Sequence, residues 1–315
     1  MMTERGLPDS TGSQRITWAE LPDEVAKGIA SLLGSEVIDA VSQPGGFSEG
    51  VAARVRLADG GRAFIKAASS VTAAAAAAFH RREIGVTGAL ADTGCVPRLL
   101  HHYDDGTWVA LVFEEIPGRL PGQPWRRAEL DRVLEAVTVL AETLTPSPVD
   151  PALLGRPRLG GWQTIVDRRL IDRVRSMTPW AADNLDHLID LERQAARVTD
   201  GQTLLHGDLY HFNVMLTPDR VFVIDWPHAW VGAAHCDVVT LLSSATASGI
   251  DPQPLLARHP LTRDLDPVEI DVVLALHAGF LLNVAATVGA SADRTMVRMM
   301  VALASGSLNW LRSRL

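Results

Sequence analysis

The feature that most constrains this chain is a polar loop enclosed by two apolar runs. Residues 204 to 216 read LLHGDLYHFNVML, and the apolar segment Val221 to Ile224 follows, ending in Asp225 and Trp226. The apolar runs predict short buried strands on both sides of the loop. Strands of this kind would hold the polar side chains of the loop with few degrees of freedom, which is what a preorganised site needs.

Three side chains of this stretch form a chemically coherent set. Asp208 and Asn213 are five positions apart, and Asp225 stands at the end of the next predicted strand. Asp208 can accept a hydrogen bond from a substrate hydroxyl, while Asn213 and Asp225 offer the hard oxygen atoms that Mg²⁺ prefers. Phosphoryl transfer requires mainly positioning and neutralised charge. The set therefore predicts a magnesium-dependent phosphoryl-transfer site.

The order HGD, four residues, N, and then IDW resembles the aminoglycoside phosphotransferase and choline kinase-like family. The resemblance implies an α+β, bilobal protein-kinase-like fold, with a small antiparallel-sheet N-lobe and a larger helical C-lobe. It implies that Asp208 is the catalytic residue and that Asn213 and Asp225 hold Mg²⁺. His206 would support the loop, and Asp237 would cap a helix or brace the catalytic loop.

The other parts that the resemblance requires occur upstream in the expected order. They are a nucleotide loop with Gly45, Gly46 and Ser48, a phosphate-binding Lys66, its helix partner Glu83, and a hinge whose backbone at Glu114 and Ile116 would receive the purine. A short glycine cluster by itself can be an ordinary turn, and a strand lysine can be a surface residue. The apolar neighbours of Lys66 favour the functional interpretation. ATP or GTP would be the co-substrate.

Local patterns predict how the chain divides. A helix is expected to start at Leu21-Pro22-Asp23, with Pro22 in its first turn, and to stop at Gly34. Hairpins are expected around residues 58–61 and 104–106, and the alanine run Ala73 to Ala78 predicts a helix continuing to Glu83. After Gly118 the pattern becomes helical. We therefore expect a disordered lead-in at residues 1–15, an N-lobe at 16–117 and a C-lobe at 118–315.

Composition excludes several classes of partner. The net charge of −8 disfavours nucleic acid and membrane surfaces, both of which attract basic patches. The chain has two cysteines, Cys95 and Cys236, which cannot form a disulfide framework. The start of the chain lacks the layout of a signal peptide, and no apolar run is expected to be long enough to span a bilayer. These features predict a cytoplasmic protein and leave its oligomeric state open.

Two other functions are compatible with the same residues. One is a catalytically silent nucleotide-binding module on the same fold, although such a module need not keep Lys66, Asp208, Asn213 and Asp225 together. The other is a metal-dependent hydrolase, because His206, Asp208 and His211 have the spacing H-x-D-x-x-H.

The acceptor is not readable from these motifs. Residues 227 to 315 contain seven Asp and Glu against six Arg, whereas a polycationic aminoglycoside calls for an acidic cleft. The acceptor is therefore expected to be a small hydroxylated metabolite or antibiotic, of which an aminoglycoside, a macrolide and an amino sugar are examples. His211 and Trp226 are candidates for the acceptor pocket.

Overall fold

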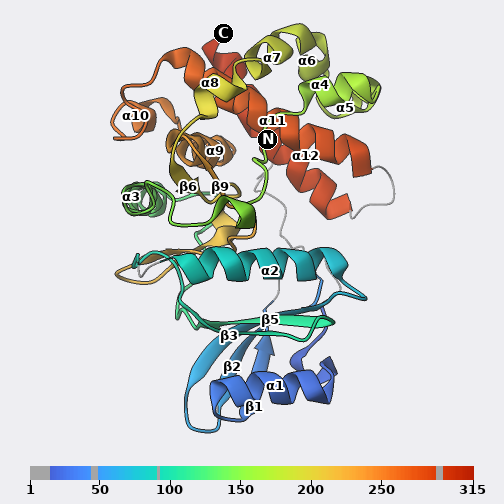
Figure 1. Cartoon of the computed structure of the whole chain (residues 1–315). Helices are drawn as coiled ribbons and strands as arrows, with labels where there is room; N and C mark the ends of the chain where they lie inside the picture. The colour runs from blue at the N-terminus through green and yellow to red at the C-terminus, as the bar shows by residue number, and fades with distance from the viewer. Residues whose placement is uncertain (1–14, 44–48, 91–92, 289–293) are drawn as a thin grey trace, which may run out of the picture.

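The computed structural model describes residues 15–43, 49–90, 93–288 and 294–315, which form two lobes. A lobe built on one sheet lies at the bottom of Figure 1, and a larger helical lobe lies above it. The predicted α+β, bilobal architecture is confirmed. The predicted disordered lead-in falls almost entirely outside the described residues. Its last residue, Arg15, donates a hydrogen bond from Nη1 to the carbonyl of Gln43 at 3.1 Å.

The N-lobe is built on one antiparallel sheet. Its strands are β1 (Val37–Ser42), β2 (Val51–Leu57), β3 (Arg62–Ser69), β4 (Leu99–Asp104) and β5 (Trp108–Glu114), in the order β1-β2-β3-β5-β4. Both predicted hairpins are present. In the first, Asp59 Oδ1 accepts from the N–H of Gly61 at 2.8 Å and Gly60 has a φ of 91°. These are local features of a tight turn, so the sequence could predict them.

Two helices cover opposite faces of this sheet. They are α1 (Asp23–Leu33), which ends at Gly34 as predicted but has Pro22 at its N-cap rather than in its first turn, and α2 (Ala74–Ala89). The short turn η1 (Trp18–Glu20) precedes them. Figure 1 shows α2 between the sheet and the C-lobe. Ala76 and Ala77 are buried, because their small side chains let α2 lie close to the sheet. Since side chains alternate along a strand, Ile65 packs on the α1 side and Lys66 faces α2.

The C-lobe consists mainly of helices. They are α3 (Arg127–Thr143), α4 (Trp162–Asp167), α5 (Ile171–Met177), α6 (Pro179–Asp183), α7 (Leu185–Glu192), α8 (Ala195–Thr199), α9 (His235–Thr246), α10 (Gln253–Leu256), α11 (Pro267–Val288) and α12 (Arg294–Arg314), with η2 (Pro151–Leu153) after α3. Helix α11 lies at the centre and packs against α12, α9 and α7. One apolar core joins these elements.

Helix α11 corrects one expectation from the sequence. It is long and apolar enough to cross a membrane by length and composition, with a mean hydropathy of 1.7, although no such run was expected. Of that apolar window, 72% is buried inside the C-lobe. A helix that is apolar on all sides is also what the centre of a large helical core requires. The composition of α11 is therefore explained by its place in the core.

Two short antiparallel strand pairs hold the polar loop between the lobes. β6 (Thr203–Leu205) pairs with β9 (Trp230–Gly232), and β7 (Val214–Leu216) pairs with β8 (Val221–Val223), with the turn η3 (His211–Asn213) leading into β7. The segment after the hinge joins this unit, because Arg119 and Leu216 exchange backbone hydrogen bonds of 3.0 and 2.7 Å. The apolar runs predicted to flank the loop are therefore buried strands, as expected.

Candidate active site

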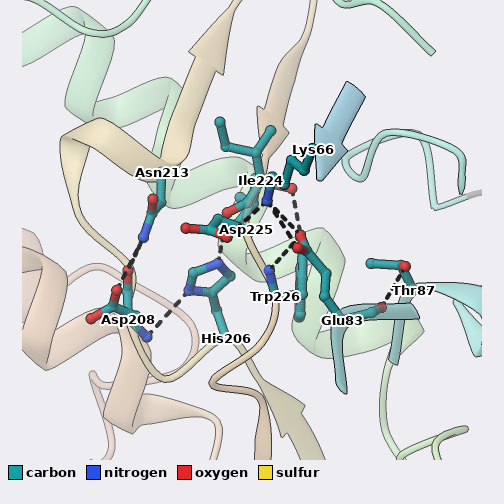
Figure 2. Close-up of polar contacts among 10 residues, drawn as sticks. Lys66, Glu83, Thr87, His206, Asp208, Asn213, Ile224, Asp225 and Trp226 are labelled. Atoms are coloured by element: carbon teal, nitrogen blue, oxygen red, sulfur yellow. Dashed lines mark hydrogen bonds and ion pairs between the residues drawn. The ribbon is translucent and has the colours of Figure 1, made fainter. Parts of the chain in front are cut away.

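A lysine from the N-lobe contacts carboxylates from two other elements. Lys66 Nζ on β3 donates to both carboxylate oxygens of Glu83 on α2 at 2.9 Å, and to Oδ1 of Asp225 after β8 at 2.8 Å. Figure 2 shows the three side chains converging. Glu83 is buried, whereas 46% of the Asp225 side chain is exposed. The predicted pairing of Lys66 with Glu83 is present, and Lys66 also links the two lobes.

The charges of this cluster stabilise one another. Burial by itself would lower the pKa of Lys66, but Asp225 and Glu83 outweigh it and raise that pKa. Burial would raise the pKa of Asp225, but the charge of Lys66 outweighs it and brings the pKa to about 2. Lys66 is therefore a cation and Asp225 an anion at neutral pH. These are the forms that bind phosphate oxygens and a divalent cation.

The loop that carries Asp208 is held by a buried aspartate from α9. Asp237 accepts hydrogen bonds from the backbone N–H of His206 at 2.7 Å and of Gly207 at 3.1 Å. Gly207 has a φ of 74°, and a Cβ there would lie 2.6 Å from the carbonyl oxygen of His228. Only glycine satisfies both conditions without strain. Of the two roles considered for Asp237, the structure shows the bracing of the loop and no side-chain cap on α9.

Asp208 lies at the tip of this loop. Asn213 Nδ2 donates to the backbone carbonyl of Asp208 at 2.8 Å and to its Oδ2 at 3.3 Å, as Figure 2 shows. The amide nitrogen is thereby used within the loop, and the amide oxygen of Asn213 is the atom left to bind a cation. The spacing of five residues thus serves the loop geometry as well as the proposed ligand set.

Asp225 has an uncommon backbone conformation. Its φ of 69° is in the left-handed region, where aspartate is tolerated better than most residues. The preceding Ile224 donates its N–H to the carbonyl of Asn213 at 3.0 Å, and its own carbonyl lies 2.9 Å from His206 Nε2. These bonds fix the segments that carry Asn213 and Asp225 to each other. The two predicted metal ligands are therefore held on neighbouring segments.

The structure contradicts the hydrolase alternative. Both ring nitrogens of His206 face protein groups, since Nδ1 accepts from the backbone N–H of Asp208 at 3.2 Å and Nε2 faces the carbonyl of Ile224. His206 is also only 2% exposed. No group of three or more His, Cys, Asp or Glu with metal-binding geometry occurs in the described part of the chain. His206 thus has the supporting role that the family resemblance implied.

The predicted nucleotide loop can be followed only at its edges. Gly45, Gly46 and Ser48 lie outside the described residues. Just after them, Gly50 has a φ of 112°, and a Cβ there would lie 2.3 Å from the carbonyl oxygen of Ala67. A glycine is required at this close approach of β2 to β3.

The hinge differs in one detail from the expectation. The backbone N–H of Glu114 donates to the carbonyl of Arg98 at 3.0 Å, and its carboxylate also binds Arg98. That N–H is therefore used inside the sheet and is not a donor for a purine. Ile116, which is buried, accepts from the N–H of Gly118 at 2.8 Å through its carbonyl. The carbonyl of Glu114 and the N–H of Ile116 stay predicted contacts of the purine.

One of the two proposed acceptor residues was wrong. Trp226 is 1% exposed, and its Nε1 donates to the carbonyl of Val223 at 3.0 Å, so its side chain belongs to the core. It packs edge-to-face on His206. His211 is half-buried and packs against Trp125 and Phe212. Proximity in sequence to Asp225 did not indicate the direction of the Trp226 side chain.

Sequence reasoning missed the residues that surround Asp208 on its other side. Arg158 Nη1 donates to Asp208 Oδ1 at 2.7 Å. Behind the loop, the hydroxyl of Tyr210 is 2.6 Å from His277 Nε2, and His277 Nδ1 is 2.7 Å from the hydroxyl of Ser307. Arg158 lies in an irregular segment before α4, and the other partners come from α11 and α12. No local sequence pattern connects them.

The buried His277 predicts a specific loss of stability in acid. Burial lowers its pKa to about 4, against 6.5 for the free side chain. The unfolded chain therefore binds a proton that the folded chain excludes, and stability falls as pH decreases from about 6.5 toward 4. We expect His277 to account for about 2 kcal/mol of the stability difference between pH 7 and pH 5. Urea denaturation of the unaltered protein and of His277→Gln at both pH values measures this difference in the free energy of unfolding. An equal difference in both proteins would contradict this assignment.

Comparison with known proteins agrees with this geometry. The model of the phosphotransferase enzyme family matches residues 45–268. An aminoglycoside 3'-phosphotransferase from Streptomyces ribosidificus is 28% identical over 169 residues, which are 50% of this chain and 61% of that protein. The alignment thus spans less than two thirds of the relative.

Solved structures show the same fold at low identity. A thermostable mutant of the aminoglycoside phosphotransferase APH(4)-Ia, in a ternary complex with AMP-PNP and hygromycin B, has a TM-score of 0.59 at 14% identity, covering 93% of this chain and 99% of that one. A choline/ethanolamine kinase family protein from Mesorhizobium loti has a TM-score of 0.58 at 16% identity, covering 93% and 94%. With the family match over most of its length, this chain belongs to the phosphotransferase enzyme family and has its bilobal kinase-like fold.

Proposed function

We propose that the protein is a magnesium-dependent kinase that transfers the γ-phosphoryl group of ATP or GTP to a hydroxyl of a small molecule. The observation that carries the proposal is the Lys66 ammonium held between Glu83 and Asp225, beside a loop that presents Asp208 and Asn213. The family match and the phosphotransferase relative support the same class of reaction.

Each residue of the site has a separate role in the proposed reaction. Lys66 binds phosphate oxygens of the nucleotide, and Glu83 keeps the ammonium in place. Asp208 accepts the proton of the acceptor hydroxyl as its oxygen attacks the γ-phosphorus. The bond from that phosphorus to the β,γ-bridging oxygen breaks, and the nucleoside diphosphate leaves with the electron pair. The products are the phosphorylated acceptor, the diphosphate and one proton.

The donor set beside Asp208 fits Mg²⁺. Asp225 provides a half-exposed, ionised carboxylate, and Asn213 provides an amide oxygen. Two protein oxygens suffice, because Mg²⁺ keeps several waters and takes further oxygens from the nucleotide phosphates. Bound there, Mg²⁺ would neutralise charge on the β- and γ-phosphates. A neighbouring structure of this fold, an amicoumacin kinase, was solved with AMP-PNP and Ca²⁺, which supports a nucleotide and a divalent cation as partners.

The catalytically silent alternative is less well supported. A module that only binds nucleotide has no need for Asp208, which contacts neither Lys66 nor Glu83 in the described hydrogen bonds. The loop that presents Asp208 is nevertheless fixed by hydrogen bonds that involve Asp237, Gly207 and Asn213.

The two free thiols, Cys95 and Cys236, support action in a reducing compartment such as the cytoplasm.

Lysine replacement tests the nucleotide half of the proposal. Lys66 and Lys27 are the two lysines of the sequence, and Lys27 is exposed on α1. We expect Lys66→Met to weaken Mg²⁺-nucleotide affinity by about 10- to 100-fold, because a charge-assisted contact to phosphate is lost. Lys27→Met, the matched control, should bind as the unaltered protein does. Calorimetric titration with AMP-PNP and Mg²⁺ measures both. Equal affinities in the two variants would reject Lys66 as the phosphate ligand.

A further inference from the structure

A cation that the proposed reaction does not use lies directly against the catalytic aspartate. The ion pair of Arg158 with Asp208 has side chains that are 21% and 17% exposed. The pair is thus at the edge of the site, where solvent and a ligand can reach it. An acceptor whose hydroxyl approaches Asp208 must also approach Arg158.

The positive charge is held in this place by a neighbouring ring and by the anchored segment that carries it. The guanidinium carbon lies 5.0 Å from the ring centroid of Phe280 on α11, a favourable cation–π arrangement. The segment that carries Arg158 is tied to the same helix, because Gly160 donates its N–H to the carbonyl of Leu276 at 2.7 Å and Trp162 Nε1 donates to the carbonyl of Ala275 at 2.8 Å. If the guanidinium moved away from Asp208, it would lose its contact with the ring of Phe280.

Of the other ionisable groups around this position, two are neutral and one is a buried carboxylate used by the backbone of the loop. Asp208, Arg158, Tyr210, His277 and Asp237 line a small hollow next to the catalytic loop. Burial raises the pKa of Tyr210 and lowers that of His277 to about 4, so both are neutral at pH 7. Asp237 is buried and accepts from two backbone N–H groups. Apart from the carboxylate of Asp208, the accessible charged group of this hollow is therefore the guanidinium of Arg158.

Arg158 also has donors left for a second partner. A guanidinium has five N–H groups. Within the described part of the chain, Arg158 makes one hydrogen bond with these groups, from Nη1 to Asp208 Oδ1. The planar fork can therefore hold Asp208 and bind an anionic oxygen group at the same time, which suits arginine better than lysine.

We propose that Arg158 is a specificity-determining residue of the acceptor site, and that the acceptor is a hydroxylated molecule carrying a carboxylate or another anionic oxygen group near the reacting hydroxyl. This inference rests on the proposed kinase function and names its class of acceptor. A fixed cation beside Asp208 repels an acceptor ammonium and attracts an anion. A neutral polyol and a polycation are the competing classes.

Matched acceptors that differ only in charge test the proposal. D-gluconate, D-glucitol and D-glucamine carry a negative, a neutral and a positive group on the same carbon skeleton, and glycerate, glycerol and 3-amino-1,2-propanediol repeat the series at smaller size. Calorimetric titration of the full chain loaded with Mg²⁺ and AMP-PNP measures their affinities. We expect the acid of at least one series to bind about tenfold or more tightly than its neutral and amine counterparts.

Substitutions then assign the preference to one side chain. Arg158→Gln should weaken binding of the acid by about 10- to 100-fold and leave the neutral member within about threefold. Arg158→Lys, which keeps the charge, should keep the order of affinities with a smaller preference. Arg156→Gln is the matched control, since it removes the same charge from an exposed position two residues away. It should leave the order unchanged.

Each other outcome counts against the proposal. A flat order in both series, a preference for the amine, or an order that survives in Arg158→Gln would overturn it. Failure of the kinase proposal is recognised separately, because in that case the unaltered protein would not bind AMP-PNP and Mg²⁺, or, as a silent module, would bind them and turn over neither ATP nor GTP with any acceptor. If ATP or GTP is turned over and the charge order is absent, only the acceptor class is wrong. Thermal melting of Arg158→Gln and Arg158→Lys distinguishes lost recognition from lost folding.

Discussion

Replacing Asp208 by Asn should lower turnover by about two to four orders of magnitude and leave nucleotide affinity nearly unchanged. Asp208 contacts Arg158 and Asn213, whereas the described contacts of Lys66, the proposed phosphate ligand, are to Glu83, Asp225 and Phe113. The substitution removes the proposed base for the acceptor hydroxyl and keeps the shape of the side chain. Single-turnover phosphoryl transfer and AMP-PNP titration measure the two effects separately.

Two results would argue against this role for Asp208. Turnover close to that of the unaltered protein would show that another group accepts the proton. A parallel loss of nucleotide affinity would place Asp208 on the nucleotide side of the site. Because the substitution also leaves Arg158 without its carboxylate partner, thermal melting of the variant is needed to show that the loop still folds. We expect only a modest change there, since the pair is partly exposed.

The second large effect is expected at Asp225. Asp225→Asn keeps the shape of the side chain and tolerates the left-handed φ of 69°, but it removes the anion of the proposed cation site. We expect the ratio of nucleotide affinities with and without Mg²⁺ to fall by about 10- to 100-fold, and kcat/KM to fall at least as much. Calorimetry with AMP-PNP, in the presence of Mg²⁺ and of a chelator, measures the ratio.

The control for this experiment comes from the same hairpin. Asp219 is exposed in the turn between β7 and β8, where it accepts a hydrogen bond from the Thr217 hydroxyl. Asp219→Asn removes an equal charge six residues before Asp225 and should leave the magnesium dependence intact. If Asp225→Asn also keeps that dependence, the carboxylate is not a metal ligand and its main function is the contact with Lys66.

The parts of the fold that could be predicted from the sequence are those with local causes. The two hairpins follow from turn residues such as Asp59 and Gly60, and α2 follows from a run of alanines. The loop with Asp208 and Asn213 was recognisable because the proposed reaction needs both residues in one tight loop, so their spacing is itself the signal. The buried strands on both sides of this loop could be predicted from the short apolar runs that flank it.

The contacts that define the site mostly join residues that are far apart in the sequence. Some of these contacts could be predicted from sequence patterns and others could not. Lys66 and Asp225 are 159 residues apart, yet both belonged to a recognisable pattern and could be assigned to one site. Arg158 and Asp208 are 50 residues apart and no pattern joins them. Trp226 shows the same limit, because its neighbour Asp225 is half-exposed while the indole is buried.

The sequence by itself therefore determined the two lobes, the loop that carries Asp208 and Asn213, and the identity of the charged groups that we propose to bind phosphate. Tertiary structure alone decided that α11 is packed in the core, that Trp226 is buried, and that Arg158 packs on Phe280 beside Asp208. The physical reason is that turn, helix and strand preferences act over a few residues. The direction of a side chain and its distant partners depend on how whole helices pack.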